Sequence, residues 1–197
     1  LAHTTPVTET ERVPLLDALG RVAAEDVYAA FDNPPFDRSP LDGYTFAAAS
    51  TADASAERPV RLTVVGEECA GDFFAGTVGA GACVRIMTGG AIPAGCDCVV
   101  RQEDVREEGD AIFVPFTSQP FENYCYAGED IKKDTLLLAK GQRIRASQIA
   151  VLASEGHADV GVHRRVRSAV ASTGDELLQP GEPLRPGKIY NSNLYLL

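Results

Sequence analysis

The sequence predicts an α+β fold, in which a β-rich, barrel-like module is inserted into a small mixed α/β domain and the start of a further α/β domain follows. Two helix-like segments, at residues 14–19 and 147–155, flank a β-rich stretch of short apolar runs and glycine-containing turns. A strand-like run at 166–171 leads into a Pro/Gly-rich connection. We therefore expect a split α/β domain, a β-rich domain and a truncated third domain at residues 1–43 with 128–165, 44–127 and 166–197.

The two helices are predicted from spacing and from stop signals. Pro14 suits a first helical position, and Gly20 suits the position just past a helix end. In residues 147–155, apolar side chains recur at helical spacing, and Gly156 follows. The stretch 22–27 is expected to be extended.

The β-rich domain is predicted from alternation and from turn residues. Residues 60–64 and 84–86 alternate with period two, and 98–100 and 111–114 are further short apolar runs. Glycines recur between these runs, as expected for turns. Strands this short and this closely spaced favour a small barrel or sandwich.

The end of the chain predicts an incomplete domain. Residues 166–171 are a strand candidate, and Ser192-Asn193 resembles a helix N-cap leading into the last four residues. A strand and one helical turn cannot bury themselves as an independent unit. We therefore expect the chain to be a fragment that stops just inside a third, α/β domain.

Composition narrows the classes of function. A net charge of −10 argues against a nucleic-acid footprint or binding to an anionic membrane surface, and no apolar run approaches a membrane span. The first residues lack the pattern of a signal peptide. Five cysteines without a secretory context predict reduced thiols, and the single-residue spacer of Cys96-x-Cys98 is too short for a zinc site. We expect a soluble cytoplasmic protein with structural cysteines and with histidines that are structural or surface groups.

Residues 31–44 are the most informative stretch. Three prolines exclude a helix interior and a central strand, yet large apolar side chains accompany them. A rigid loop that presents Asp37, Ser39 and Asp42 fits this composition, and such loops often carry binding groups. An ordered crossover between two domains, with Asp42-Gly43 as a turn, is the alternative.

Four blocks in order support a family resemblance. They are residues 34–44 (PPFDRSPLDGY), 85–93 (RIMTGGAIP), 128–131 (GEDI), and 172–177 with 189–193 (STGDEL and IYNSN). Together they resemble the MoeA-type molybdopterin molybdotransferases, the family that includes the E domain of gephyrin. The resemblance extends from Glu11 onward. It implies that the third domain, truncated here, is the molybdopterin-binding one.

The resemblance also implies an activity in molybdenum cofactor biosynthesis. The substrates would be molybdate and adenylylated molybdopterin, Mg²⁺ would assist as cofactor, and AMP would be released. The expected assembly is a homodimer whose composite site forms in trans, between the third domain of one subunit and the first two domains of the other. A molybdopterin adenylyltransferase is the expected protein partner.

By motif position, the resemblance implies a set of site residues. The catalytic candidates are Asp42, which is also the metal ligand, and Glu176. A hard cation such as Mg²⁺ prefers carboxylates together with phosphate oxygens, and glycines allow the backbone to approach a ligand closely. The candidates for substrate binding are Ser39, Thr88, Gly89, Asp130, Asp175 and Asn193.

One segment departs from the family pattern. Tyr124-Cys125-Tyr126-Ala127 stands where the family commonly has basic residues before the GEDI block. Because anionic substrates need cations, this change puts phosphate or molybdate binding by the segment in doubt. A non-catalytic module that dimerises or binds a partner, derived from the same family, is therefore the alternative function.

Overall fold

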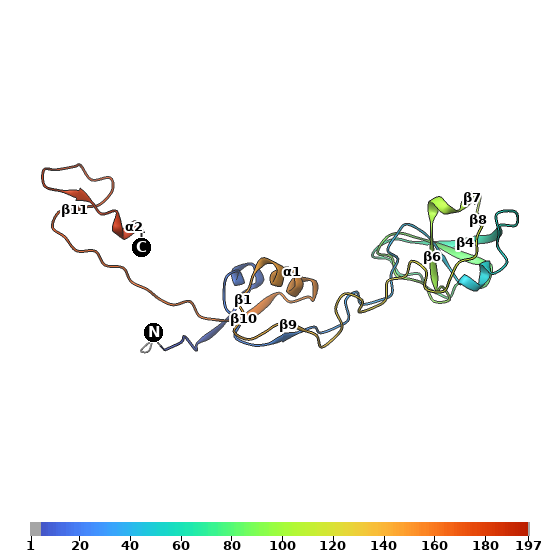
Figure 1. The fold of residues 1–197 in the computed structure, drawn as a ribbon, viewed down its shortest axis with the longest axis horizontal. Coiled ribbons are helices and arrows are strands. Elements are labelled where there is room, and N and C mark those ends of the chain that lie inside the picture. Colours follow the sequence, from blue (N-terminus) through green and yellow to red (C-terminus); the bar gives the residue numbers. More distant parts are fainter. Residues whose placement is uncertain (1–4, 197) are drawn as a thin grey trace.

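The computed structural model describes residues 5–196, and Figure 1 shows them as three parts along one long axis. The middle part carries β1 (Thr10–Pro14), α1 (Ala146–Ser154) and β10 (Asp159–His163). A β-rich part lies at one end, and the C-terminal segment, drawn in red, lies at the other. No helix among the described residues is long and apolar enough to cross a membrane.

The β-rich part is one curled, six-stranded sheet that forms a half-barrel (Figure 1). Neighbouring strands run antiparallel, except for the one parallel pair, β4 with β5. The four apolar runs predicted as strands all lie in this sheet, so these predictions are confirmed. Across the sheet the order is β6 (Cys98–Arg101), β3 (Gly43–Phe46), β5 (Ala82–Ile86), β4 (Val60–Glu68), β8 (Ala111–Val114) and β7 (Arg106–Glu108).

One hydrophobic core lies inside this sheet. Phe46, Leu62 and Ile112 are fully buried there, beside Cys83 and Cys98. Two short 3-10 helices, η2 (Ala48–Thr51) and η3 (Gln102–Asp104), follow β3 and β6.

A second core lies in the middle part and draws on both ends of the chain. Leu15 and Ala18 pack there with Leu138, Leu152 and Val162. Two antiparallel pairs surround them: β1 with β10, and β2 (Val27–Tyr28) with β9 (Leu136–Leu138). Segments on either side of the β-rich part thus share one core.

Two stretches of chain, which we call the neck, run side by side between the two cores. The neck comprises residues 31–42 and 123–133. Asn33 and Ile131 exchange two backbone hydrogen bonds of 2.7 and 3.0 Å, and Arg38 and Cys125 exchange two of 2.9 and 3.1 Å. The bond between Asn33 and Pro34 is cis. The proline-rich loop is therefore an ordered connection as well as a carrier of candidate site residues.

The first predicted helix has a different form. Residues 15–18 make a single 3-10 turn, η1 (Leu15–Ala18), because too few residues separate Pro14 from Gly20 for an α-helix to develop. Gly20 has a φ of +77°, which glycine adopts without strain. The second predicted helix is confirmed as α1. In the stretch 22–27, predicted as extended, Val22 and Ala23 make isolated bridges and β2 begins at Val27.

The prediction of a strand at 166–171 is wrong. These residues have no regular structure and are exposed, since no strand among the described residues lies beside them. The C-terminal segment instead contains the parallel pair of β11 (Leu177–Leu178) and β12 (Ile189–Tyr190), followed by α2 (Asn193–Leu196). The helix start at Ser192-Asn193 is confirmed, but the capping contact comes from Asn191, whose Oδ1 accepts the Leu194 N–H at 3.3 Å.

Candidate functional site

The loop of residues 31–44 is fixed by its own carboxylate. Asp37 accepts hydrogen bonds from the Tyr124 hydroxyl at 2.6 Å and from the Ala127 N–H at 2.8 Å. Burial, and secondarily the contact with Asp37, raises the pKa of Tyr124, so the phenol stays a neutral donor. The segment that departs from the family pattern therefore anchors the loop by hydrogen bonding.

Asp42 is held at the end of this loop by one residue of the β-rich part. Its Oδ1 accepts both the backbone N–H and the hydroxyl of Thr88, each at 2.7 Å. Its Oδ2 has no hydrogen-bond partner within residues 5–196. The backbone bond, then the hydroxyl bond, and more weakly the charge of Arg85, lower the pKa of Asp42. The carboxylate is thus charged, oriented and free on one oxygen.

Glycines allow the chain segments around Asp42 to approach each other. A Cβ on Gly43 would lie 1.8 Å from the Val100 carbonyl oxygen, so no larger residue fits between β3 and β6. Gly89 has a φ of +86°, and its N–H donates to the Ser39 carbonyl at 2.8 Å. The Ser39 N–H in turn donates to the Gly90 carbonyl at 3.0 Å. The loop and the turn after β5 are therefore paired by their backbones.

A pocket of about 360 Å³ opens beside Asp42 and Thr88. Arg101, at the end of β6, also lines it, and its guanidinium forms no ion pair with a described carboxylate. Glu103 lines the same pocket. Sequence reasoning missed Arg101 and Glu103; the only signal was that both follow closely on the apolar run of residues 98–100. The pocket thus offers a cation, a carboxylate with a free oxygen, and a hydroxyl.

Two further predicted site residues lie in the neck. Ser39 is buried, and its hydroxyl donates to the Leu41 carbonyl at 2.6 Å, within the loop itself. Asp130 is exposed and contacts the Arg38 guanidinium at 3.5 Å. Ser39 is close to Asp42 along the chain, whereas Asp130 lies on the other stretch of the neck, and neither residue lines the Asp42 pocket.

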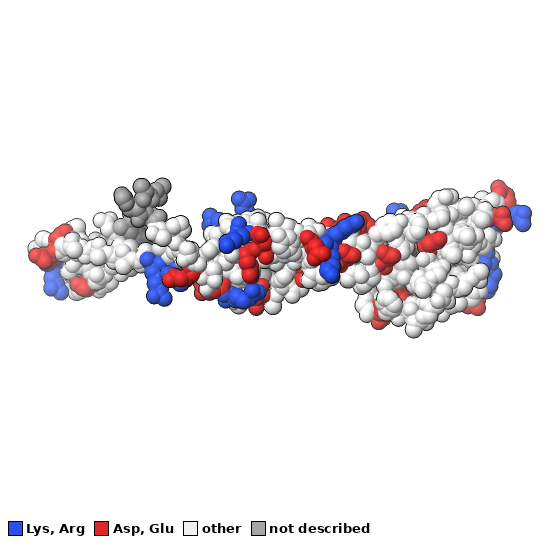
Figure 2. Space-filling model, turned by 90° about the horizontal axis from the view of Figure 1, so that it is seen from below, with Lys and Arg blue, Asp and Glu red and all other residues white. Residues whose placement is uncertain are grey.

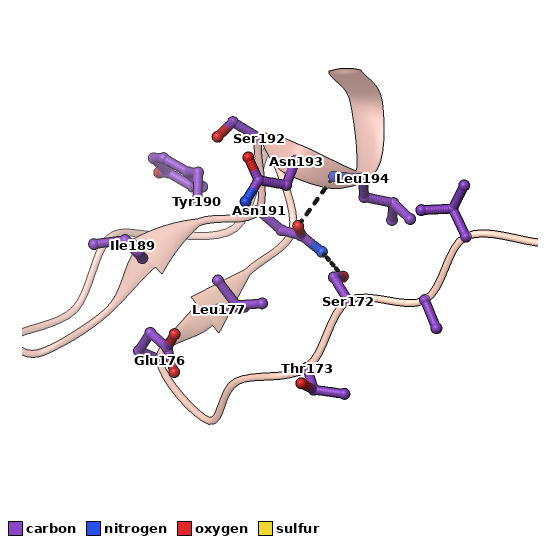
Figure 3. A pocket seen from close by; sticks show the side chains of 12 residues that line it. Ser172, Thr173, Glu176, Leu177, Ile189, Tyr190, Asn191, Ser192, Asn193 and Leu194 are labelled. Atoms are coloured by element: carbon purple, nitrogen blue, oxygen red, sulfur yellow. Dashed lines mark hydrogen bonds between the residues drawn. The ribbon is translucent and has the colours of Figure 1, made fainter. Parts of the chain in front are cut away.

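The remaining predicted residues lie in the C-terminal segment, which forms a second pocket of about 340 Å³. Glu176 and Asn193 line it, whereas Asp175 does not. Figure 3 shows Asn191, which sequence reasoning missed, between Ser172 and the first turn of α2. Its Nδ2 donates to the Ser172 hydroxyl at 2.6 Å, and only 4% of the residue is exposed. Asn191 thus organises this pocket from its interior.

The structure gathers the predicted residues into two groups. Asp42, Thr88, Gly89 and Ser39 lie where the neck meets the β-rich part, but Glu176 lies in the C-terminal segment. The middle part lies between these two regions along the long axis (Figure 1). Within one chain, the two groups do not form a single site.

Within residues 5–196, no group of three or more His, Cys, Asp or Glu side chains could hold a metal ion. Burial raises the pKa of Cys83 and Cys98 to about 12, and that of Cys96 to about 11. These three thiols are neutral near pH 7.

Comparisons with known proteins agree with the sequence resemblance. The family described as MoeA N-terminal region (domain I and II) matches residues 1–156. The molybdopterin molybdenumtransferase of Bacillus subtilis is 43% identical over 189 residues, which cover 94% of this chain and 44% of that protein. That of Nostoc is 39% identical, over 96% of this chain and 43% of that protein.

A solved structure has the same fold. The crystal structure of the molybdopterin biosynthesis moeA protein from Pyrococcus horikoshii superimposes with a TM-score of 0.85 at 38% identity, over 98% of this chain and 51% of that one. The chain spans less than half the length of the curated relatives described above. With a family match over most of its length, the chain belongs to the MoeA N-terminal family, the one that comprises domains I and II.

Proposed function

We propose that the protein acts in molybdenum cofactor biosynthesis, where molybdate is inserted into adenylylated molybdopterin and AMP is released. The names of the relatives, molybdopterin molybdenumtransferase, support this proposal. They do not favour the alternative of a non-catalytic module. The upstream partner would be a molybdopterin adenylyltransferase, since it would supply the substrate.

The observation that carries the proposal is the geometry of Asp42. Thr88 occupies Oδ1 with two donors and leaves Oδ2 free at the edge of a pocket. Mg²⁺ is usually held by one or two carboxylates together with substrate phosphate oxygens and water. A single oriented carboxylate, with Glu103 in the same pocket, fits that mode of binding and does not fit an all-protein metal cage. Mg²⁺ bound there would offset the charge on the scissile phosphoanhydride.

The other residues of this pocket suit a phosphate-bearing substrate. The Arg101 guanidinium would contact phosphate oxygens, and the Thr88 hydroxyl would hold Asp42 in place or turn toward the substrate. Gly89 would allow close approach of the backbone. Ser39, being buried, would shape the loop, and Asp130 would keep Arg38 in place.

We also propose that the complete site forms in trans in a homodimer. Glu176 and Asn193 would act with the Asp42 pocket of a second subunit, and Asp175 would support the turn that carries Glu176. The separation of the two groups in Figure 1 supports this arrangement, because one chain does not bring them together.

Complementation tests the role of Asp42. The complete reading frame, with Asp42→Asn, would be placed in a strain that lacks molybdopterin molybdenumtransferase. The amide keeps the shape of the side chain but removes its charge, so we expect loss of molybdoenzyme activity at normal protein level. Asp53→Asn, an exposed aspartate in the same part of the molecule, is the matched control and should complement fully. Full complementation by Asp42→Asn would refute the assignment.

A further inference from the structure

A third hollow, of about 440 Å³, lies in the middle part and belongs to neither pocket described above. It is formed by the turn after η1, by Arg143 and by the end of β10 with the residues that follow it. Arg21, Arg143, Arg164 and Arg165 all line it, together with His163. In a chain with 28 acidic and 18 basic residues, this is a local concentration of positive charge.

Two of these arginines are already neutralised. Arg21, only 9% exposed, donates to Glu11 and, at 2.8 Å, to the backbone carbonyl of His163. Arg164 donates to Glu9. These two ion pairs therefore add no net charge to the hollow.

The other two arginines have no such partner. Arg143 and Arg165 form no ion pair with any carboxylate in residues 5–196. Figure 2 shows both basic and acidic side chains over the middle of the molecule. Two positive charges therefore remain uncompensated in one concave site.

A further polar group lacks a partner. The Nδ1 atom of His163 is buried and has no hydrogen-bond partner among the described residues. The rest of the lining includes the apolar side chains of Leu19, Val22 and Val166. Leu19 and Val166 are 56% and 76% exposed, so the hollow has an apolar margin open to solvent.

We propose that this hollow binds a tetrahedral oxyanion with two negative charges, presented either as a phosphate ester or as free molybdate. Each guanidinium offers paired N–H donors that match two oxygens of such an anion. Two unpaired arginines balance two charges, and the volume lies within the range of small-ligand pockets. The apolar margin would accommodate the organic part of an ester. The choice of molybdate as a candidate ligand rests on the function proposed above, but calorimetry of this hollow and complementation by Asp42→Asn are separate measurements, so the two proposals can fail independently.

Isothermal titration calorimetry of the 197-residue chain, in chloride buffer at low ionic strength, tests the proposal. Phenyl phosphate, inorganic phosphate and sodium molybdate are titrated in turn. The double variant Arg143→Gln/Arg165→Gln should bind at least about tenfold more weakly, because charge-assisted hydrogen bonds are lost. Arg58→Gln, an exposed arginine outside the hollow, is the matched control and should bind as the unaltered chain does.

The three anions distinguish the source of the ligand. Tighter binding of phenyl phosphate than of inorganic phosphate would support a phosphate ester, and tightest binding of molybdate would support the free oxyanion. The inference would be overturned by absence of saturable binding at millimolar concentrations. Equal affinity in the double variant, with an unchanged melting temperature, would also overturn it.

Discussion

Replacing Gly43 by alanine should destabilise the β-rich part far more than an ordinary glycine substitution. The new Cβ would lie 1.8 Å from the Val100 carbonyl oxygen and 2.8 Å from the carbonyl carbon, well inside van der Waals contact. Both atoms belong to backbone in β6, which cannot move aside as a flexible side chain could. Strand β3 must therefore shift by more than an ångström or give up part of its pairing with β6.

The expected loss of stability follows from these two responses, a shift of β3 or a loss of its pairing with β6. Overpacking in a well-packed interior costs about 1–3 kcal/mol, and each backbone hydrogen bond lost adds about 1 kcal/mol. We therefore expect a loss of roughly 2–4 kcal/mol in the free energy of unfolding, and a melting temperature lower by roughly 5 °C or more. Differential scanning calorimetry of the purified chain measures both quantities.

Gly79→Ala is the matched control. Gly79 has no atom within 4 Å of an added Cβ, and its φ is not positive. This substitution should be neutral or stabilise by about 0.4–1 kcal/mol through the unfolded state. If Gly43→Ala melted at the same temperature as Gly79→Ala, the close approach of β3 to β6 would be refuted, and with it the placement of Asp42.

Three further outcomes are expected. Thr88→Val removes the hydroxyl that donates to Asp42 but keeps the backbone N–H donor. The lowered pKa of Asp42 should therefore rise toward its ordinary value of 3.8, which NMR of the carboxyl group can measure. An unchanged pKa would contradict the contact between the two side chains. In native protein at about pH 8 the Cys83 and Cys98 thiols, with pKa values raised to about 12, should resist iodoacetamide while exposed Cys69 reacts, which mass spectrometry can detect. Equal alkylation of all three would show that the core is open. The purified 197-residue chain should release no AMP from adenylylated molybdopterin, with or without Mg²⁺ and molybdate, and turnover would argue against a composite site.

The strands of the half-barrel could largely be predicted from the sequence, because alternating runs such as residues 60–64 report burial directly. Strand β3 could not, since its four residues are all buried and carry no alternation. The strand predicted at 166–171 is absent because an apolar run forms a strand only where a neighbouring strand pairs with it. The local sequence does not show whether such a neighbour is present.

The residues of the candidate site likewise include some that the sequence predicts and some that depend on tertiary contacts. Asp42, Thr88 and Gly89 were predicted from motif order, and the structure brings them together. Arg101 was missed because its role depends on β6 lying next to β3, a tertiary contact. Asn191 was missed because its two hydrogen bonds join segments nineteen and three residues away in sequence, to Ser172 and Leu194.

The geometry of Asp42 depends on the register of two strands. In the antiparallel pair of β3 and β5, Gly43 lies opposite Ile86, so the next residues along each strand are Asp42 and Met87. Thr88 then follows within hydrogen-bonding reach of the carboxylate, at 2.7 Å. A slip of one residue would turn every side chain of β3 to the opposite face of the sheet. Because Phe46 is fully buried on the core side, the same burial that forbids this slip also fixes the position of the carboxylate. The register of β3 with β5 therefore determines both the packing of the half-barrel core and the position of Asp42, on which the proposed chemistry depends.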